Sequence, residues 1–223
     1  MRLAFRNLFQ NKTRLAISVG GVALALMLIL ALDAVFTGAE RQVTAFIDNS
    51  GADVFVSQMG VRNMHMAGSA LPASAIAQVE AVSGVESVTP ILYVTNVIRS
   101  GEERSLAYII GLPEGAQAGR VWNVAAGRGE PGLGGTVIDR GVAEKSGVSV
   151  GDEVEVLGSE FEVVGLSEGT ANFVNSVAFI SLEDFAAVRG SSGVVSFLLV
   201  KVAEGQSPEE IAARIEREVG NVT

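Results

Sequence analysis

An uninterrupted apolar run near the N-terminus constrains this chain more than any other feature. Residues 15–32 (LAISVGGVALALMLILAL) contain no charged side chain. At a helical rise of 1.5 Å per residue, a run of this length extends about 27 Å, close to the thickness of the hydrocarbon core of a bilayer. Continuation to Phe36 would let the helix span the bilayer with some tilt. We therefore predict one transmembrane helix over residues 15–36.

Charge divides the chain at this run. Residues 1–14 carry four basic side chains and no acidic one, whereas the remaining residues carry 12 basic and 25 acidic side chains. Basic flanks stay on the cytoplasmic side, so we expect residues 1–14 to form a cytoplasmic basic elbow and residues 37–223 to lie outside the cytoplasm. A cleaved secretory signal is the alternative, but its apolar region is ordinarily shorter, about 7–15 residues. The net charge of −9 also argues against nucleic acid as a partner.

Composition removes most kinds of catalytic site. The chain has no cysteine and one histidine, which excludes disulfides, zinc–thiolate sites, cysteine nucleophiles and multi-histidine metal centres. Gly127, Gly129 and Gly132 match a dinucleotide-binding spacing, but no strand leads into them and no helix follows to hold a phosphate. The chain also lacks a P-loop. We therefore predict no catalytic residues, no cofactor and no ATPase activity in this chain.

One group of residues is a weak candidate for a metal site. Three of the five methionines and the only histidine fall within eight positions, as Met59, Met64, His65 and Met66. Thioether and imidazole ligands together suit Cu(I). The interpretation we favour is an adaptable, partly apolar loop, in which methionine adjusts to a partner surface.

After the apolar run, hydrophobic spacing predicts short strands interspersed with short helices. Strands are expected over residues 53–58, 85–99, 103–112, 136–139, 153–157, 161–166, 176–180 and 194–202. Helices are expected from Pro72 to about Val82, over residues 140–146 and from Ser181 to Val188, and a last one opens with a capping box at Ser207. The Gly-rich residues 113–135 show little periodicity.

This order of elements favours an α+β architecture over a doubly wound parallel sheet. The final strand and helix need a sheet to join, and the sheet formed by residues 45–112 is the natural host. We therefore expect residues 113–190 to be a β-rich insertion.

Several segments resemble one membrane-protein family. The opening LAFRNLFQNKTRLAISVGGVALAL is similar to the start of MacB/FtsX-type ABC transporter permeases, in which a basic elbow leads into the first membrane helix. Gly51-Ala-Asp-Val-Phe-Val, Val85-Glu-Ser-Val-Thr-Pro-Ile, Ile109-Ile-Gly-Leu-Pro and Phe161-Glu-Val-Val-Gly-Leu resemble the periplasmic core domain of that family, as does the run from Val137 to Asp152. The resemblance covers nearly the whole chain in order.

The resemblance implies a porter-like subdomain (residues 45–112 and 192–223) and a second, β-rich subdomain (residues 113–190). It also implies a permease homodimer or heterodimer in the cell membrane, served by a cytoplasmic ATP-binding subunit. Movements would be relayed through residues 35–47 to the outer domain. There, work would be done on a peptide, drug, lipid or lipoprotein without making or breaking a covalent bond. Family members carry three further membrane helices after this domain, so we expect a chain that ends at Thr223 to be the front part of a permease.

Two alternatives remain open from the sequence. The first is a membrane-anchored extracytoplasmic binding or sensor module with no transport role. The second is an anchored hydrolase, for which His65 would have to serve as the only histidine base.

Overall fold

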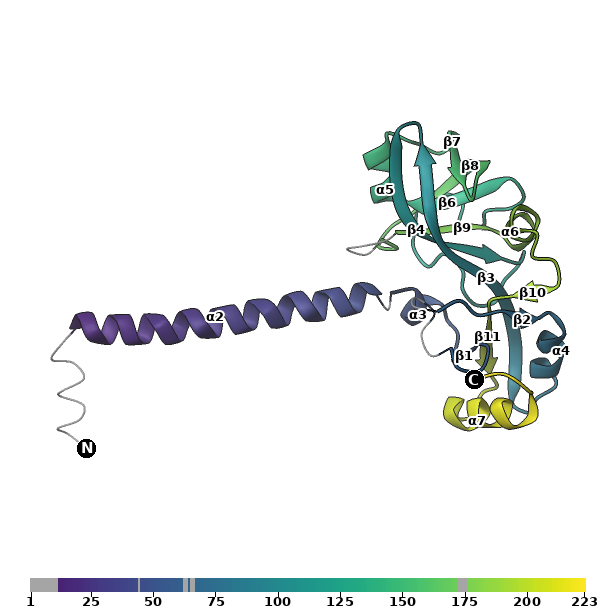
Figure 1. Ribbon diagram of the computed structural model, residues 1–223, viewed down its shortest axis with the longest axis horizontal. Helices are drawn as coiled ribbons and strands as arrows, with labels where there is room; N and C mark the ends of the chain where they lie inside the picture. Colours follow the sequence, from purple (N-terminus) through teal and green to yellow (C-terminus); the bar gives the residue numbers. More distant parts are fainter. Residues whose placement is uncertain (1–11, 44, 62–63, 65–66, 172–175) are drawn as a thin grey trace. The chain divides into compact units, whose positions relative to one another are not determined.

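The computed structural model describes residues 12–43, 45–61, 64, 67–171 and 176–223 (Figure 1). The chain divides into two units, residues 1–43 and residues 44–223, and each is described by itself.

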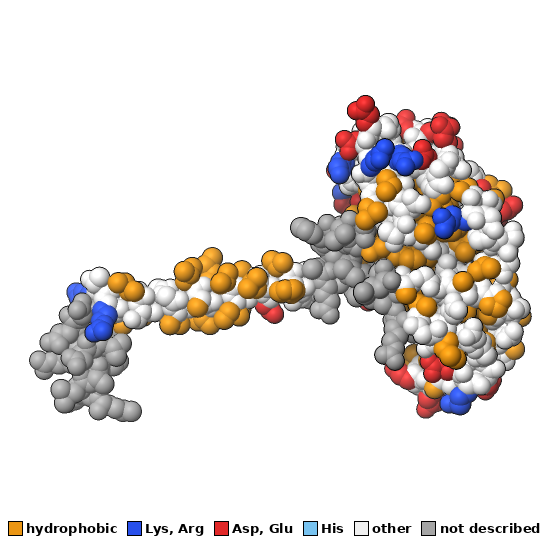
Figure 2. Space-filling model, in the orientation of Figure 1, with side chains coloured by type: hydrophobic (Ala, Val, Ile, Leu, Met, Phe, Trp, Pro, Cys, Tyr) orange, Lys and Arg blue, Asp and Glu red, His pale blue; other side chains and the backbone are white. Residues whose placement is uncertain are grey.

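The first unit contains the helix α2 (Lys12–Val43). The large apolar side chains from Ile17 to Phe36 are exposed on all sides of this helix, and orange side chains cover its visible face in Figure 2. The part Lys12–Gly38 is long and apolar enough to cross a membrane, by length and composition. The helix continues beyond the predicted end at Phe36, because residues 39–42 include the good helix formers Ala39, Glu40 and Arg41.

The second unit is built on a mixed nine-stranded sheet with the order β1-β11-β3-β4-β9-β6-β8-β5, in which β7 pairs with β3 and β8. The strands are β1 (Val54–Val56), β3 (Val85–Ser100), β4 (Glu103–Leu112), β5 (Val124–Gly127), β6 (Gly135–Asp139), β7 (Glu153–Val156), β8 (Ser159–Ser167), β9 (Ser176–Ser181) and β11 (Phe197–Val202). A separate pair consists of β2 (Leu71–Pro72) and β10 (Val194–Val195). The helices of this unit are α3 (Ala45–Asn49), α4 (Ser74–Glu80), α5 (Arg140–Ser146), α6 (Leu182–Arg189) and α7 (Pro208–Glu218).

The long strand β3 has different partners along its two halves. Residues 85–91 pair antiparallel with β11, and residues 92–100 pair antiparallel with β4. At the change of partner, the backbone N–H of Ser196 donates to the carbonyl of Ile91 at 2.8 Å, and its hydroxyl accepts from the N–H of Tyr93 at 3.0 Å. One strand therefore belongs to both ends of the domain (Figure 1).

Three apolar cores hold the domain together. Alternate residues of the central strands point to opposite faces, so Ile109 and Ala178 belong to a first core, whereas Ile110 and Phe179 belong to a second. Helices α5 and α6 pack on the first core. A third core lies around β1, β11, α4 and α7, with Ile211 among its fully buried side chains. Acidic side chains gather mostly at the two ends of the domain in Figure 2.

The mixed α+β architecture predicted from the sequence is confirmed. Three helix starts also follow prediction, because Asp139, Ser181 and Ser207 each cap a helix by accepting a backbone N–H. The final strand joins the host sheet between β1 and β3, but it is interrupted at Ser196, which separates β10 from β11.

Two local predictions need correction. Pro72 does not open a helix but lies in β2 opposite Val194, and α4 begins only at Ser74. The backbone N–H of Ala73 donates to the carbonyl of Gly193 at 2.9 Å, which extends this pairing. A proline is tolerated there because a short edge strand does not need its missing N–H. The Gly-rich stretch was expected to be irregular, yet residues 124–127 form β5 against β8.

Candidate functional site

The domain contains a cleft where two parallel strands end. β4 and β9 run parallel, with Leu112 opposite Ser181 at their carboxyl ends. The chain after β4 turns to the second core, where Ala118 and Trp122 pack, whereas the chain after β9 turns to the first core through Phe185 of α6. Connections that leave neighbouring parallel strands toward opposite faces of a sheet open a crevice between them, a common place for ligands.

This cleft has a volume of about 890 Å³. Its apolar lining comes from the loop after β4, the loop before β6 and α6; it includes Leu112, Pro113, Pro131, Leu133, Leu182 and Ala186. The charged lining comprises Arg120, Arg128, Glu114, Glu130 and Glu183, all exposed. The size is typical of a pocket for a small molecule or a short peptide segment.

The loop before β6 contains the glycine pattern noted in the sequence. Gly127 ends β5 with a positive φ of 68°, and Gly129 and Gly132 line the cleft. The next element is β6, which begins at Gly135, so no helix N-terminus follows the glycines to hold a phosphate. Gly127 serves close packing instead, because a Cβ there would lie 2.3 Å from the carbonyl oxygen of Val164.

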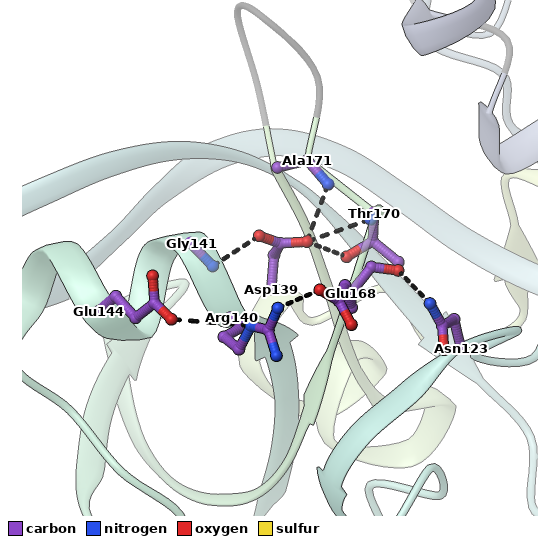
Figure 3. A network of polar contacts seen from close by, with 8 residues as sticks. All are labelled: Asn123, Asp139, Arg140, Gly141, Glu144, Glu168, Thr170 and Ala171. Carbon is purple, nitrogen blue, oxygen red and sulfur yellow. Dashed lines mark hydrogen bonds and ion pairs between the residues drawn. The ribbon is translucent and has the colours of Figure 1, made fainter.

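Asp139 organises a network of polar contacts that joins several segments of the domain (Figure 3). Its buried carboxylate caps α5 through one oxygen, which accepts the N–H of Gly141 at 2.8 Å. Its other oxygen accepts the N–H and the hydroxyl of Thr170, at 3.1 and 2.7 Å, and the N–H of Ala171 at 3.0 Å. One side chain thus ties the start of a helix to a loop about thirty residues further along, as a structural clamp.

The outer part of this network is an ion pair on the surface. Arg140 pairs with Glu168 and, at 3.6 Å, with Glu144 one turn further along α5. The backbone of Glu168 exchanges hydrogen bonds with Asn123, whose side-chain amide donates to the Glu168 carbonyl at 3.1 Å (Figure 3). These groups are well paired with one another, which favours a structural role over a catalytic one.

Phe46 anchors the start of the domain. This α3 side chain is 3% exposed, and its ring lies 6.5 Å from those of Phe55 and Phe179 and 6.3 Å from that of Trp122. The carbonyl of Ser50, just after α3, accepts the N–H of Gly119 at 2.6 Å. The first residues of the domain are therefore fixed to its second core.

Shifted pKa values occur at Asp53 and Tyr93, besides the fully exposed Glu209, whose pKa is lowered by a hydrogen bond from the Ser207 side chain. Burial opposes ionisation of Asp53, but a hydrogen bond from the N–H of Val202 and the ammonium of Lys201 more than offset it and lower the pKa of the carboxyl. Burial raises the pKa of the Tyr93 phenol, against the effect of a hydrogen bond with Thr95. None of the three groups lines the cleft.

The candidate metal ligands are not all in one environment. Met64 is 7% exposed and belongs to the second core, whereas Met59 is 62% exposed. His65 and Met66 lie outside the described residues. Among the described residues, no group of three or more His, Cys, Asp or Glu side chains could hold a metal ion.

The cleft itself was not predicted from the sequence. Its charged residues come from the Gly-rich stretch and from α6. The glycine spacing at Gly127, Gly129 and Gly132 was the pattern noted there, and it was rejected as a phosphate site. The useful signal would have been the pairing of residues 107–112 with residues 176–181, which the order of elements alone does not specify.

Comparison with known proteins places this fold. The domain resembles the extracellular domain of the noncanonic ABC-type transporter YknZ from Gram-positive bacteria, with a TM-score of 0.57 and 18% identity over 74% of this chain and 90% of that one. It also resembles the periplasmic region of MacB from Actinobacillus actinomycetemcomitans, with a TM-score of 0.57 and 14% identity over 80% of this chain and 92% of that one. No curated protein sequence matches the chain significantly.

The sequence family is shown independently of these structures. The model of the MacB-like periplasmic core domain matches residues 15–218, which include both the apolar helix and nearly all of the folded domain. The chain belongs to the MacB-like periplasmic core domain family.

Proposed function

We propose that this chain is a permease component of a MacB-type ABC transporter, which couples ATP hydrolysis by a separate cytoplasmic subunit to export or mechanical work outside the cytoplasm. The observation that carries the proposal is the family match over residues 15–218, since it spans the candidate membrane helix and the domain together. The chain itself performs no bond chemistry in this role.

The proposed topology places residues 1–14 in the cytoplasm and the domain outside it. The distribution of basic residues supports this orientation, because Lys12 and Arg14 precede the apolar part of α2 and no further basic residue occurs before Arg41. The permease acts as a homodimer or a heterodimer in the lipid bilayer.

Coupling passes through the covalent connection from α2 to α3. Phe46 is packed among three aromatic rings, so a displacement of α3 has to displace the second core or break its packing. Within the domain, residues 45–112 with 192–223, and residues 113–190, act as two subdomains. The pairing of β11 with β1 and with residues 85–91 of β3 supports the grouping of residues 192–223 with the first segment.

Association with an ATP-binding subunit is the test of this proposal. The tagged full chain, in its native genetic context, should copurify with an ATP-binding protein at a fixed stoichiometry, and the ATPase rate should depend on the permease. Phe46→Ala should weaken that dependence, whereas Ile47→Ala, at an exposed neighbouring position, should not. If no ATP-binding protein associates with the full chain, the membrane-anchored binding module becomes the better description.

A further inference from the structure

We propose that the loop after β4, residues 113–122, is a mechanical strap through which a displacement of α3 changes the width of the cleft. The inference deepens the proposed function and rests on it for the origin of that displacement. It concerns the part of the domain that the coupling rearranges, and it requires no particular ligand in the cleft.

The strap is fastened to the start of the domain. Gly119 donates its backbone N–H to the carbonyl of Ser50, just after α3, at 2.6 Å. Trp122 lies at the end of the strap, and its ring is 6.3 Å from the ring of Phe46 in α3. A backbone hydrogen bond and an aromatic contact therefore join the strap to the segment into which α2 leads, so the strap has to follow α3 or lose both contacts.

The strap is also tightly packed where it is fastened. Ala118 is 1% exposed, and its backbone N–H donates to the hydroxyl of Thr89 in β3 at 3.3 Å. Gly119 has a φ of 78°, and a Cβ there would lie 3.1 Å from Leu199 and 3.2 Å from Leu112. Close-packed interiors transmit a displacement instead of absorbing it. The fastened part of the strap thus moves together with its neighbours.

The opposite wall of the cleft is held by different elements. The loop before β6 is bonded to α6, because the N–H of Gly134 donates to Asp184 at 2.9 Å and the hydroxyl of Ser181 donates to the same carboxylate at 2.7 Å. Helix α6 in turn packs on the first core. Within the described part of the chain, no hydrogen bond or ion pair joins residues 113–122 to residues 128–134 or to α6. The two walls can therefore shift against each other without breaking such a bond.

This difference in attachment makes the cleft responsive to α3. The strap supplies one wall through Pro113, Glu114, Ala116 and Arg120. Since that wall is fastened to α3 and the other to the first core, a displacement of α3 relative to the first core changes the separation of the walls. Small shifts of packed elements, absorbed by loop residues, are a common form of domain rearrangement.

Distances between paired spin labels test this inference. The chain has no cysteine, so Glu114→Cys combined with Leu133→Cys introduces one labelling site on each wall, and both positions are exposed. Leu133→Cys combined with Glu183→Cys is the reference pair, because the loop before β6 and α6 are bonded to each other. The full chain is measured in lipid nanodiscs by double electron–electron resonance, after dilution with unlabelled chain so that only distances within one chain contribute.

We expect two variants to shift the mean distance between labels at positions 114 and 133 by more than about 2 Å. Gly119→Ala displaces the strap from its neighbours, and Phe46→Ala removes the anchor of α3. The matched controls are Gly205→Ala, which has a similar φ of 82° but open space around it, and Phe161→Ala, which leaves a cavity in the first core. Both controls should keep the wild-type distance, and the reference pair should stay unchanged in every variant. Gly119→Ala is the milder change, so the test stands if Phe46→Ala does not fold.

Two outcomes in the isolated chain would overturn the inference. They are a wild-type distance in Gly119→Ala, and a shift of equal size in Gly205→Ala or in the reference pair, since either would show a general loosening.

Nucleotide provides the second measurement, in preparations that contain the copurified ATP-binding subunit. ATP should shift the distance between positions 114 and 133 in the wild type and have a smaller effect in Gly119→Ala. An unchanged distance in the wild-type complex would overturn the inference as well. If no ATP-binding subunit associates with the chain, the proposed function fails, whereas the distances measured without nucleotide still decide whether the strap links α3 to the cleft.

Discussion

The helix α2 and the central sheet use the same apolar residue types in opposite ways. Large apolar side chains of α2 are exposed on every side, whereas those of β6, of β9 and of β4 from Tyr108 onward are buried on both faces of the sheet. Phe36 is 72% exposed and Phe179 is fully buried, although both are phenylalanines in regular secondary structure. The difference shows that α2 suits an apolar environment that this polypeptide does not supply, whereas the apolar side chains of the sheet are buried within the domain itself.

The largest effect is expected from removing the same side chain in the two regions. Phe179→Ala should lower the free energy of unfolding of the domain by about 3–5 kcal/mol, because it leaves a cavity in the second core. Phe36→Ala should change that free energy by less than about 0.5 kcal/mol. Chemical denaturation monitored by Trp122 emission measures both, and equal losses would break the comparison.

The reverse test places a charge in α2. Leu26→Arg should disfavour membrane insertion by about 2.5–3.5 kcal/mol, whereas Leu26→Val keeps a favourable apolar side chain. The measurement is the fraction of each variant in membranes after extraction at alkaline pH. Retention of the arginine variant at the wild-type level would show that α2 does not depend on a lipid environment.

The polar clamp at Asp139 gives a smaller effect within the domain. Asp139→Asn should lower the unfolding free energy by about 1–3 kcal/mol, because an amide has one accepting oxygen and must abandon either the cap of α5 or the loop at Thr170. Asp184→Asn is the control. One Asp184 oxygen accepts both the N–H of Gly134 and the hydroxyl of Ser181, so the amide oxygen of the variant can keep the bond from Gly134. A similar loss in both variants would contradict the clamp.

The smallest effect concerns pH and Asp53. Its pKa is lower in the folded domain than in the unfolded chain, so ionised Asp53 stabilises the fold above its unfolded pKa of about 3.9, and that contribution is lost as pH falls through the folded pKa. The partly exposed pair with Lys201 is worth no more than about 1 kcal/mol. Unfolding of wild type and Asp53→Asn should therefore differ more at pH 7 than at pH 2.5; a constant difference would exclude this linkage.

Local signals in the sequence predicted most elements of the fold. Caps at Ser181 and Ser207, the hairpin that joins residues 100 and 103, and the apolar run of α2 each depend on neighbours in sequence. The partners of distant strands did not follow in the same way. β4 and β9 are far apart in the sequence, so no hydrophobic period or turn residue specifies their pairing. The position of the cleft depends on this pairing and could not be predicted either.

Errors occurred where tertiary pairing overrode a local preference. Pro72 has a suitable place at a helix start, but the pairing of β2 with β10 draws it into a strand. Residues 124–127 have little strand character of their own, and β8 provides the pairing that makes them β5. Both cases show that a weak local preference yields to a partner far away in the sequence.

The division of β3 also sets the order in which the domain can assemble during synthesis. Ile98 meets Ser105 within a hairpin as soon as β4 exists, whereas Val88 pairs with Val200, which the ribosome adds 112 residues later. At about 5–20 residues per second, the first half of β3 waits roughly 6–22 s for that partner. Residues 85–91 therefore expose an unpaired edge until the last strand arrives, and this interval is when the nascent domain is most open to wrong pairing or to a chaperone.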